Sequence, residues 1–319
     1  MTIAPPLKAP FPYFGGKSTV AERVWSRLGD VANYIEPFFG SGVMLLRRPT
    51  TPKTETANDL DCNIANFWRA TQFAPEKVAV WADWPVNEAD LHARHRWLCG
   101  LGYNTSPDRK LARFRARIRL DPSYFDPRRA GWWAWGACLW IGSGWCGDWG
   151  RTVDGDCDSR RPHLSHRRNL LWDRGQIMAW LIRLRGRLRN VRVCCGDWSR
   201  ICSSWTTTVG LGLTGVFLDP PYSDVANRHP ALYAHDDQSL AHEVRAWCRE
   251  RGPDPQMRIA LCGYDGEHNE LEASGWSIES WKTRGGYANQ GKSDGDDAHR
   301  RKERIWFSPH CLSGGGLFE

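Results

Sequence analysis

The segment Gly215–Tyr222 constrains the fold more than any other part of the chain. It reads Gly-Val-Phe-Leu-Asp-Pro-Pro-Tyr, an apolar run that ends in an acid, two prolines and an aromatic residue. Such a run is typical of a buried parallel strand, which must end at Pro220 because proline has no backbone N–H. Open α/β sheets bind ligands at the carboxyl ends of their strands. The segment therefore predicts a site in which a planar nitrogen base stacks on Tyr222 and donates hydrogen bonds to Asp219 and the Pro220 carbonyl. The alternative is a simple strand-ending turn.

Strands and helices alternate near the start of the chain and again after residue 190. The predicted strands are 33–36, 54–57, 191–194, 216–218, 257–262, 276–281 and 304–308. The predicted helices are 18–29, 43–48, 61–72 and 237–251. This alternation predicts an α/β fold with a doubly wound sheet.

The alternation is lost over residues 76–189, which are rich in Trp and Arg. We therefore expect residues 1–75 and 190–309 to form two parts of one α/β domain. Residues 76–189 would be an inserted, mostly helical or irregular domain, and residues 310–319 a flexible tail. The insert holds a group of tryptophans that we expect to form its core rather than a stacking platform. They are Trp132, Trp133, Trp135, Trp140, Trp145 and Trp149.

Positive charge is concentrated in one part of the chain. Residues 91–200 hold 22 Lys and Arg against 9 Asp and Glu, although the net charge of the whole chain is only +7. A basic block favours nucleic acid as a partner, and the alternative is a solvated surface. Arginines alternate over residues 113–119 and 183–189, which places each set on one face of a strand or spreads it around a helix.

The composition argues against a membrane span and a secretory signal. The chain has no run of 18 apolar residues, and its N-terminus lacks a basic region followed by an apolar core. Its 11 cysteines lack regular spacing and are expected to be thiols in a reducing cytoplasm. A zinc site could be imagined among Cys138, Cys146, Cys157, His163 and His166, but these spacings fit no common site, so we expect no metal.

A glycine-rich turn, Glu36–Gly42, lies at the first strand-to-helix junction. It lacks the pattern of a dinucleotide or P-loop turn, and Glu36 would repel a pyrophosphate but suits an ammonium or hydroxyl groups. Asp59 ends the next predicted strand, where nucleoside-binding folds keep an acid for the ribose, although it could equally cap a helix. Asp197 follows a third strand and could accept from an adenine amino group. Together these residues predict a site for an adenosine-bearing ligand with an amino-acid end and no phosphates.

Several motifs together resemble the Dam-type (D12 class) adenine-N6 DNA methyltransferases. Tyr13–Lys17 is similar to the family's N-terminal Trp-Ala-Gly-Gly-Lys element, and Ile35–Gly42 to its cofactor loop. Asn58–Asp59 resembles its ribose-binding acid, Asp219–Tyr222 its catalytic tetrapeptide and Glu303–Phe307 its final strand. The order of the motifs also fits, with the cofactor half first, then a DNA-recognition insert and then the catalytic half.

The resemblance implies a Rossmann-like fold, S-adenosylmethionine as cofactor and methylation of a flipped-out adenine in double-stranded DNA. The protein, either bacterial or phage-encoded, would act on intracellular DNA in the cytoplasm, and a monomer is favoured. The catalytic residues would be Asp219, Pro220, Pro221 and Tyr222. The cofactor would be bound by Tyr13, Phe14, Gly15, Lys17, Glu36, Pro37, Phe38, Gly40, Ser41, Gly42, Asp59, Asp197 and Asp219. Within the basic block, the residues expected to contact DNA are Arg128, Arg129, Arg160, Arg161, Arg167 and Arg168.

Two positions depart from the family pattern. Tyr13 stands where the family has Trp, and Pro12 replaces a basic residue that contacts DNA in relatives, so we expect no base contact at position 12. A cytosine-N4 methyltransferase would use the same chemistry, but its tetrapeptide more often begins with Ser. An RNA or protein-amide methyltransferase would more often have Asn there. An inactive nucleic-acid-binding relative is the remaining alternative, and the intact Asp219, Tyr222 and Gly40 argue against it.

Overall fold

The fold is described by a computed structural model of the chain. The described residues are 7–13, 17–50, 53–100, 109–140, 145–146, 176–203, 209–221, 239–281 and 303–313. Within them, no helix combines the length and the apolar character that crossing a bilayer requires.

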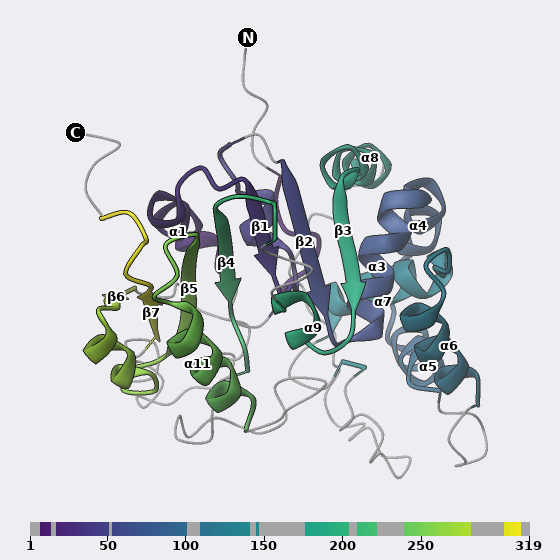
Figure 1. Ribbon diagram of the computed structural model, residues 1–319. Coiled ribbons are helices and arrows are strands. Elements are labelled where there is room, and N and C mark those ends of the chain that lie inside the picture. The colour runs from purple at the N-terminus through teal and green to yellow at the C-terminus, as the bar shows by residue number, and fades with distance from the viewer. Residues whose placement is uncertain are drawn as a thin grey trace.

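A seven-stranded sheet forms the centre of the molecule (Figure 1). Its strands are β1 (Asn33–Glu36), β2 (Thr54–Asp59), β3 (Val191–Cys195), β4 (Thr214–Leu218), β5 (Met257–Tyr264), β6 (Ser277–Ser280) and β7 (Glu303–Phe307). The order across the sheet is β3-β2-β1-β4-β5-β7-β6. All neighbours in the first five strands pair in parallel, and β7 is antiparallel to both β5 and β6. All seven predicted strands are present, and their ends lie within two residues of the predicted ones.

Helices cover both faces of the sheet. They are α1 (Ala21–Leu28), α2 (Val43–Leu46), α3 (Cys62–Phe73), α4 (Pro75–Ala82), α5 (Glu88–Leu98), α6 (Arg109–Leu120), α7 (Pro127–Leu139), α8 (Gln176–Leu188), α9 (Ser199–Cys202) and α11 (Leu240–Arg251). The described residues also form two short 3₁₀ helices, Lys17–Thr19 and Asn269–Ser274. Local chemistry starts several of them. Asp61, Asn87 and Asp126 each accept a backbone N–H at the N-terminus of α3, α5 and α7.

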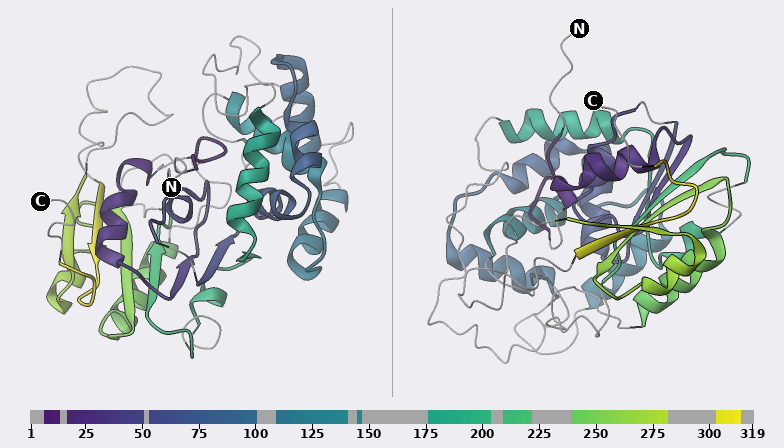
Figure 2. Two further views of the ribbon diagram at one scale, coloured as in Figure 1. Left: turned by 90° about the horizontal axis from the view of Figure 1, so that it is seen from above. Right: turned by 90° about the vertical axis from the view of Figure 1, so that its left-hand side faces the viewer.

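Alternate side chains of the strands enter two different cores. Tyr34 and Phe217 pack on the face that also holds α1, α2 and α3. Ile35, Val216 and Leu218 point to the opposite face, where α9 and α11 cover the sheet. Figure 2 shows α1 (purple) and α11 (green) on opposite sides of the sheet. The doubly wound arrangement that the sequence predicted is therefore present.

The described helices of residues 76–189 pack beside α3 at the β3 end of the sheet (Figure 2, left). Val78, Leu98, Trp133 and Leu181 belong to the same core as Tyr34. This part of the chain therefore shares its main core with the sheet, and a separate inserted domain is not confirmed. The expected core role of the tryptophans is confirmed for the two most buried, which are Trp133 and Trp135; Trp149 lies outside the described residues.

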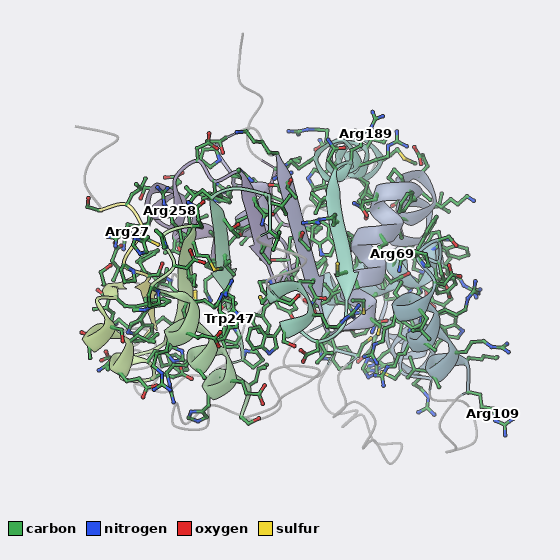
Figure 3. All side chains as sticks on the ribbon, in the orientation of Figure 1. Arg27, Arg69, Arg109, Arg189, Trp247 and Arg258 are labelled. Carbon is green, nitrogen blue, oxygen red and sulfur yellow. The ribbon has the colours of Figure 1, made fainter. Side chains whose placement is uncertain are left out.

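The alternating arginines lie on helices. In α6, Leu111, Phe114 and Ile118 are buried at helical spacing, and the arginines between them spread around the remaining surface. Helix α8 likewise buries apolar residues at helical spacing and carries arginines on its remaining surface. Its buried residues are Ile177, Leu181, Leu184 and Leu188. Figure 3 labels Arg109 at the start of α6 and Arg189 just after α8, both on the outer surface.

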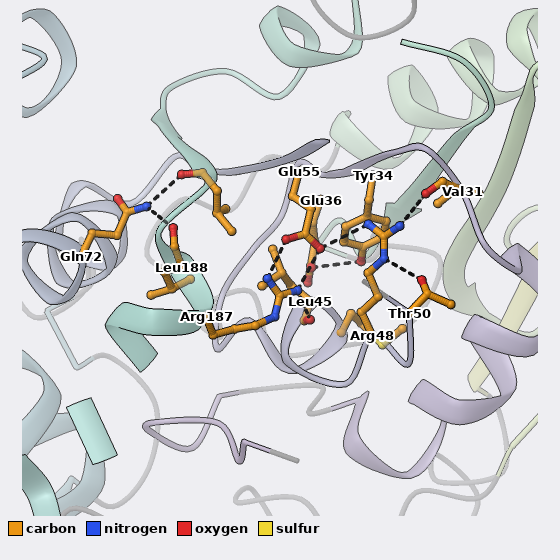
Figure 4. Close-up of polar contacts among 12 residues, drawn as sticks. Val31, Tyr34, Glu36, Leu45, Arg48, Thr50, Glu55, Gln72, Arg187 and Leu188 are labelled. Atoms are coloured by element: carbon orange, nitrogen blue, oxygen red, sulfur yellow. Dashed lines mark hydrogen bonds and ion pairs between the residues drawn. The ribbon is translucent and has the colours of Figure 1, made fainter. Parts of the chain in front are cut away.

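A buried carboxylate connects β2 to α8 and to the chain after α2 (Figure 4). Glu55 accepts two hydrogen bonds from Arg187, at 2.6 and 2.8 Å, and one from Arg48 at 3.3 Å. Arg187 also donates to the backbone carbonyl of Leu45 at 2.7 Å. Glu55 is only 2% exposed, so its charge depends on these two guanidinium groups for compensation.

Replacing Glu55 with Ala should lower the free energy of unfolding by about 3–5 kcal/mol, because Arg48 and Arg187 would lose the buried carboxylate that compensates their charges. Chemical denaturation of both proteins measures the difference. Glu76→Ala is the matched control, since Glu76 pairs with the neighbouring α8 residue Arg185 at 3.0 Å on the surface. The free energy of unfolding of the control should fall by no more than about 1 kcal/mol. Equal losses in the two variants would contradict a special role for the buried carboxylate.

Candidate active site

Four strand ends meet where the sheet reverses its order, between β1 and β4. Parallel pairing places the carboxyl ends of β1, β2, β3 and β4 at one edge of the sheet. Glu36 and Asp59 are the last residues of β1 and β2, and Asp219 directly follows β4. Open α/β sheets bind ligands at this switch point. The topology thus brings together acidic residues that are far apart in the sequence.

One buried amide holds three of these strand ends together. The Nδ2 atom of Asn58 donates to the Pro37 carbonyl at 3.1 Å and to the Gly196 carbonyl at 2.9 Å. Pro37 follows β1, Asn58 lies in β2 and Gly196 follows β3. Asn58 therefore fixes the spacing of the loops that form the edge of the site. Sequence reasoning noted Asn58 only as the neighbour of Asp59.

The predicted glycine turn lies against the N-terminal motif. Gly40 has a positive φ of 46°, and a Cβ atom there would lie 2.6 Å from the ring of Tyr13. Its carbonyl accepts a hydrogen bond from Trp68 Nε1 at 3.0 Å. Ser41 and Gly42 then lead into α2. Glycine is required at position 40 because both the backbone conformation and the contact with Tyr13 exclude a side chain.

Asp59 supports this turn. Its Oδ2 atom accepts the backbone N–H of Gly40 at 2.9 Å, and its Oδ1 atom accepts that of Asp61 at 2.9 Å. Burial, reinforced by the negative charge of Asp61, raises the pKa of Asp59 to about 7. With a third backbone hydrogen bond, from Leu60, the carboxylate still has acceptor capacity for one ligand hydroxyl.

Lys17 and Asp219 form a largely buried ion pair. The Lys17 Nζ atom lies 2.9 Å from Asp219 Oδ1, and the two side chains are 3% and 18% exposed. The same ammonium lies over the ring of Trp281, 5.5 Å from its centroid. Burial raises the pKa of Glu303, while the nearby Lys17 charge acts in the opposite direction. Trp281 and Glu303 were not predicted as site residues, because their proximity to Asp219 depends on the pairing of β5 with β7.

Pro220 and Pro221 follow Asp219 and are buried, in agreement with a strand that ends at this corner. Glu36 is 2% exposed and accepts a hydrogen bond from the Tyr34 hydroxyl at 3.0 Å. Burial raises the pKa of Glu36 well above its ordinary value. Glu36 therefore lies within the protein below the turn, rather than on an open surface.

Asp197 is exposed and makes a local turn. Its Oδ1 atom accepts the backbone N–H of Ser199 at 2.9 Å, at the start of α9. The next residue, Trp198, stacks on Phe38 with ring centroids 6.2 Å apart and an angle of 28° between the planes. An open groove of about 550 Å³ lies beside this stack, and Trp198 and Trp247 are among its lining residues (Trp247 is labelled in Figure 3). The aromatic Trp198 was missed, although it directly follows a predicted site residue.

The described residues include only some of the predicted DNA contacts. Arg129 is 4% exposed and donates to the Leu98 carbonyl at 2.8 Å and to Asn63 Oδ1 at 3.1 Å. A side chain that is buried and saturated in this way is unsuited to a phosphate contact, so its expected DNA role is not supported. Arg128 lies over the rings of Trp97 and Trp132. The remaining predicted site residues lie outside the described part of the chain, and they are Phe14, Gly15, Arg160, Arg161, Arg167, Arg168 and Tyr222.

Residues 13–80 match the family model of the D12 class N6 adenine-specific DNA methyltransferases. The match confirms the resemblance and spans the N-terminal motif, the glycine turn and Asp59. The seven-stranded, mostly parallel sheet is consistent with a methyltransferase fold. Asp219 lies outside the matched residues, and its place in the site comes from the sheet topology and the contact with Lys17. No curated protein matches the chain.

The raised pKa of Asp59 predicts a specific dependence of stability on pH. Between the ordinary pKa of 3.8 and about 7, folded Asp59 binds a proton that the unfolded chain does not. This group therefore makes the folded state less stable as the pH rises through that window. Asp59→Asn removes the ionisation, so the melting temperature of the variant relative to the wild type should be higher at pH 8 than at pH 5. We expect a difference of about 2–4 °C, the shift that corresponds to 1 kcal/mol in a large domain.

Asp197→Asn is the control, because it removes an exposed acid from a neighbouring strand end. Thermal melts of the three proteins at both pH values provide the comparison. If the difference in melting temperature between Asp59→Asn and the wild type is the same at pH 5 and pH 8, the pKa of Asp59 is not raised.

Proposed function

We propose that this protein transfers the methyl group of S-adenosylmethionine to the N6 amine of adenine in DNA. The observation that carries the proposal is the ion pair between Lys17 and Asp219. It joins the segment that matches the family to the Asp-Pro-Pro corner at the switch point of the sheet. A carboxylate held at the end of β4 is suited to accept hydrogen bonds from an exocyclic amine.

The residues at the edge of the sheet fit the proposed cofactor. The turn at Gly40 allows a ligand to approach the backbone closely, and Asp59 has remaining acceptor capacity for a ribose hydroxyl. Phe38 and Trp198 offer aromatic surface for an adenine ring at the same edge. When bound there, the cofactor would supply a methyl group on a positively charged sulfur.

Asp219 would hold the target amine. The lone pair of N6 is delocalised into the adenine ring, so the nitrogen is a weak nucleophile. Hydrogen bonds from the amine to Asp219 and to the Pro220 carbonyl would increase the electron density on N6. Held in this way, N6 would be oriented to accept the methyl group that the cofactor supplies, and its proton would then pass to solvent. The amine and the methyl carbon must approach to about 3–3.5 Å, which requires the adenine to leave the duplex.

Lys17 would act as a positioning residue for this step. Its ammonium lies 2.9 Å from Asp219 Oδ1, so it favours the ionised carboxylate and orients it. The target amine would donate its hydrogen bond to the same carboxylate group. Lys17 does not need to touch the adenine in this arrangement.

Replacing Asp219 with Ala should reduce methyl transfer to DNA by about 10²-fold or more, because a positioned acceptor for the amine is lost. Transfer of a tritiated methyl group to DNA measures the rate. Asp265→Ala is the matched control, since Asp265 pairs with Arg304 at 3.3 Å on the surface near the end of β5. The control should retain most of the activity. Activity of Asp219→Ala above about one tenth of the wild-type rate would contradict the role of Asp219.

The nucleosides of the methylated DNA separate the two candidate bases. N6-methyladenine supports the proposal, whereas N4-methylcytosine would move the protein to the alternative class. A protein that binds DNA but transfers no methyl group to either base would be the inactive relative considered above.

Arginines of the basic segment are proposed to neutralise DNA phosphates. Replacing Arg167 and Arg168 with Ala should lower the slope of log affinity against log salt by about 0.9 for each lost phosphate contact. Replacing Arg249 and Arg251 removes the same charge from the end of α11, outside the basic block of the sequence, and should leave the slope unchanged. DNA binding measured over a range of salt concentrations tests both. An unchanged slope in the Arg167 and Arg168 variant would place these residues away from DNA.

A further inference from the structure

Three ligand-type side chains meet in the helical part of the molecule, away from the strand ends. His95 and Cys99 lie one turn apart at the end of α5, and Cys146 approaches them from the chain that follows α7. All three are buried, with exposed fractions of 5%, 6% and 7%. Their ligand atoms all lie within 4.8 Å of one another.

We propose that His95, Cys99 and Cys146 bind a structural zinc ion. Thiolate sulfur and imidazole nitrogen are the ligands that Zn²⁺ prefers in proteins. At the usual Zn–S and Zn–N lengths, a sulfur and a nitrogen of a tetrahedral site lie about 3.6 Å apart. The Nε2 atom of His95 lies 3.7 Å from the Cys99 sulfur, which matches this edge of the tetrahedron. Three protein ligands leave one position for water or a fourth group.

The surroundings hold the cluster in place. Cys146 has a φ of 55°, the one positive φ among the described residues other than glycine. A non-glycine residue in this conformation is strained, and such strain persists only where neighbouring contacts hold it. The preceding residue, Trp145, provides such contacts. Its Nε1 atom donates to the Trp133 carbonyl at 3.0 Å, and its ring occupies the space where a side chain at Gly136 would lie.

The histidine ring is also fixed. It stacks on Trp140 with ring centroids 4.8 Å apart and an angle of 16° between the planes. The ring of Trp145 lies 5.1 Å from it. Ligands whose rotamers are fixed by packing lose little freedom when a metal binds, so the aromatic contacts favour binding.

A buried cation lies near the two thiols. Arg129 is 4% exposed and interacts electrostatically with Cys146 and Cys99. Zinc with two thiolates is neutral overall, so the metal would add no uncompensated charge to this buried region.

The proposed ion would attach the chain after α7 to the end of α5. Cys146 precedes the arginines at 160–168 in the sequence, and α5 packs on α7. The sequence grouping of Cys138 with Cys146 is not supported, because the Cys138 sulfur instead contacts the Pro10 carbonyl at 3.8 Å. This inference replaces the earlier expectation that the chain holds no metal. It does not depend on the proposed methyl transfer.

Metal analysis of the full chain, purified without a metal-binding tag or chelator, tests the proposal. We expect about one zinc per chain. Titration of metal-free protein with Co²⁺ should produce thiolate-to-cobalt charge-transfer absorption and the visible bands of a four-coordinate site. Cys99→Ala and Cys146→Ala should each weaken Co²⁺ binding by more than about 100-fold. Loss of a residue that only supports a metal ligand typically weakens metal binding by no more than about 100-fold, so a larger effect indicates a direct ligand.

Cys248→Ala is the matched control, since it removes an equally buried thiol from α11 and should bind the metal normally. If a ligand variant fails to fold, the wild type alone remains decisive, because chelation should lower its melting temperature and zinc should restore it. Either of two results would overturn the site: absence of both zinc and a cobalt spectrum in the wild type, or a Cys99–Cys146 disulfide in protein kept under reducing conditions.

Discussion

The ion pair between Lys17 and Asp219 depends on the completed sheet, and the proposed chemistry depends on the ion pair. Lys17 follows the N-terminal motif and Asp219 follows β4, so the two can meet only when β1 and β4 pair. A buried ammonium without a carboxylate would be strongly destabilising. Formation of the pair therefore couples assembly of the site to folding of the sheet. It also explains why the N-terminal segment lies across the strand ends, with Tyr13 against Gly40.

A second charged contact connects the helical region to the same sheet. Glu55 lies in β2. Its two partners are Arg187 of α8 and Arg48, which lies two residues after the end of α2. Helix α8 is thereby attached to β2, the strand that ends in Asp59. Asn58 then joins the ends of β1, β2 and β3. Phosphate contacts in the basic block, residues 91–200, and ligand contacts at the strand ends would thus act on one connected core rather than on two independent domains.

The limits of the sequence prediction have identifiable causes. The strands were predicted well because apolar runs, glycines and prolines mark them locally. Residues 76–189 were expected to be mostly helical or irregular, but their individual helices were not located, because arginines fill the exposed face of α6 and α8 and hide the apolar positions at helical spacing. Arg129 lies in the basic block of the sequence, where a DNA-binding arginine would be expected. It is buried, however, because α7 packs against α3 and α5. Asp197 is a strand-end acid like Asp59, but its described contacts are to the start of α9.

The sequence by itself determined the strands, the turn at Gly40, the acids at the strand ends and the resemblance to the D12 class. These features depend on local rules: proline ends strands, glycine allows positive φ, and parallel strands place their following residues at one edge. Only the tertiary structure decided that Lys17 meets Asp219, that Glu55 holds two arginines, and that His95, Cys99 and Cys146 converge. Such contacts join residues far apart in the chain, and their distances follow from how helices and strands pack, which no local pattern encodes.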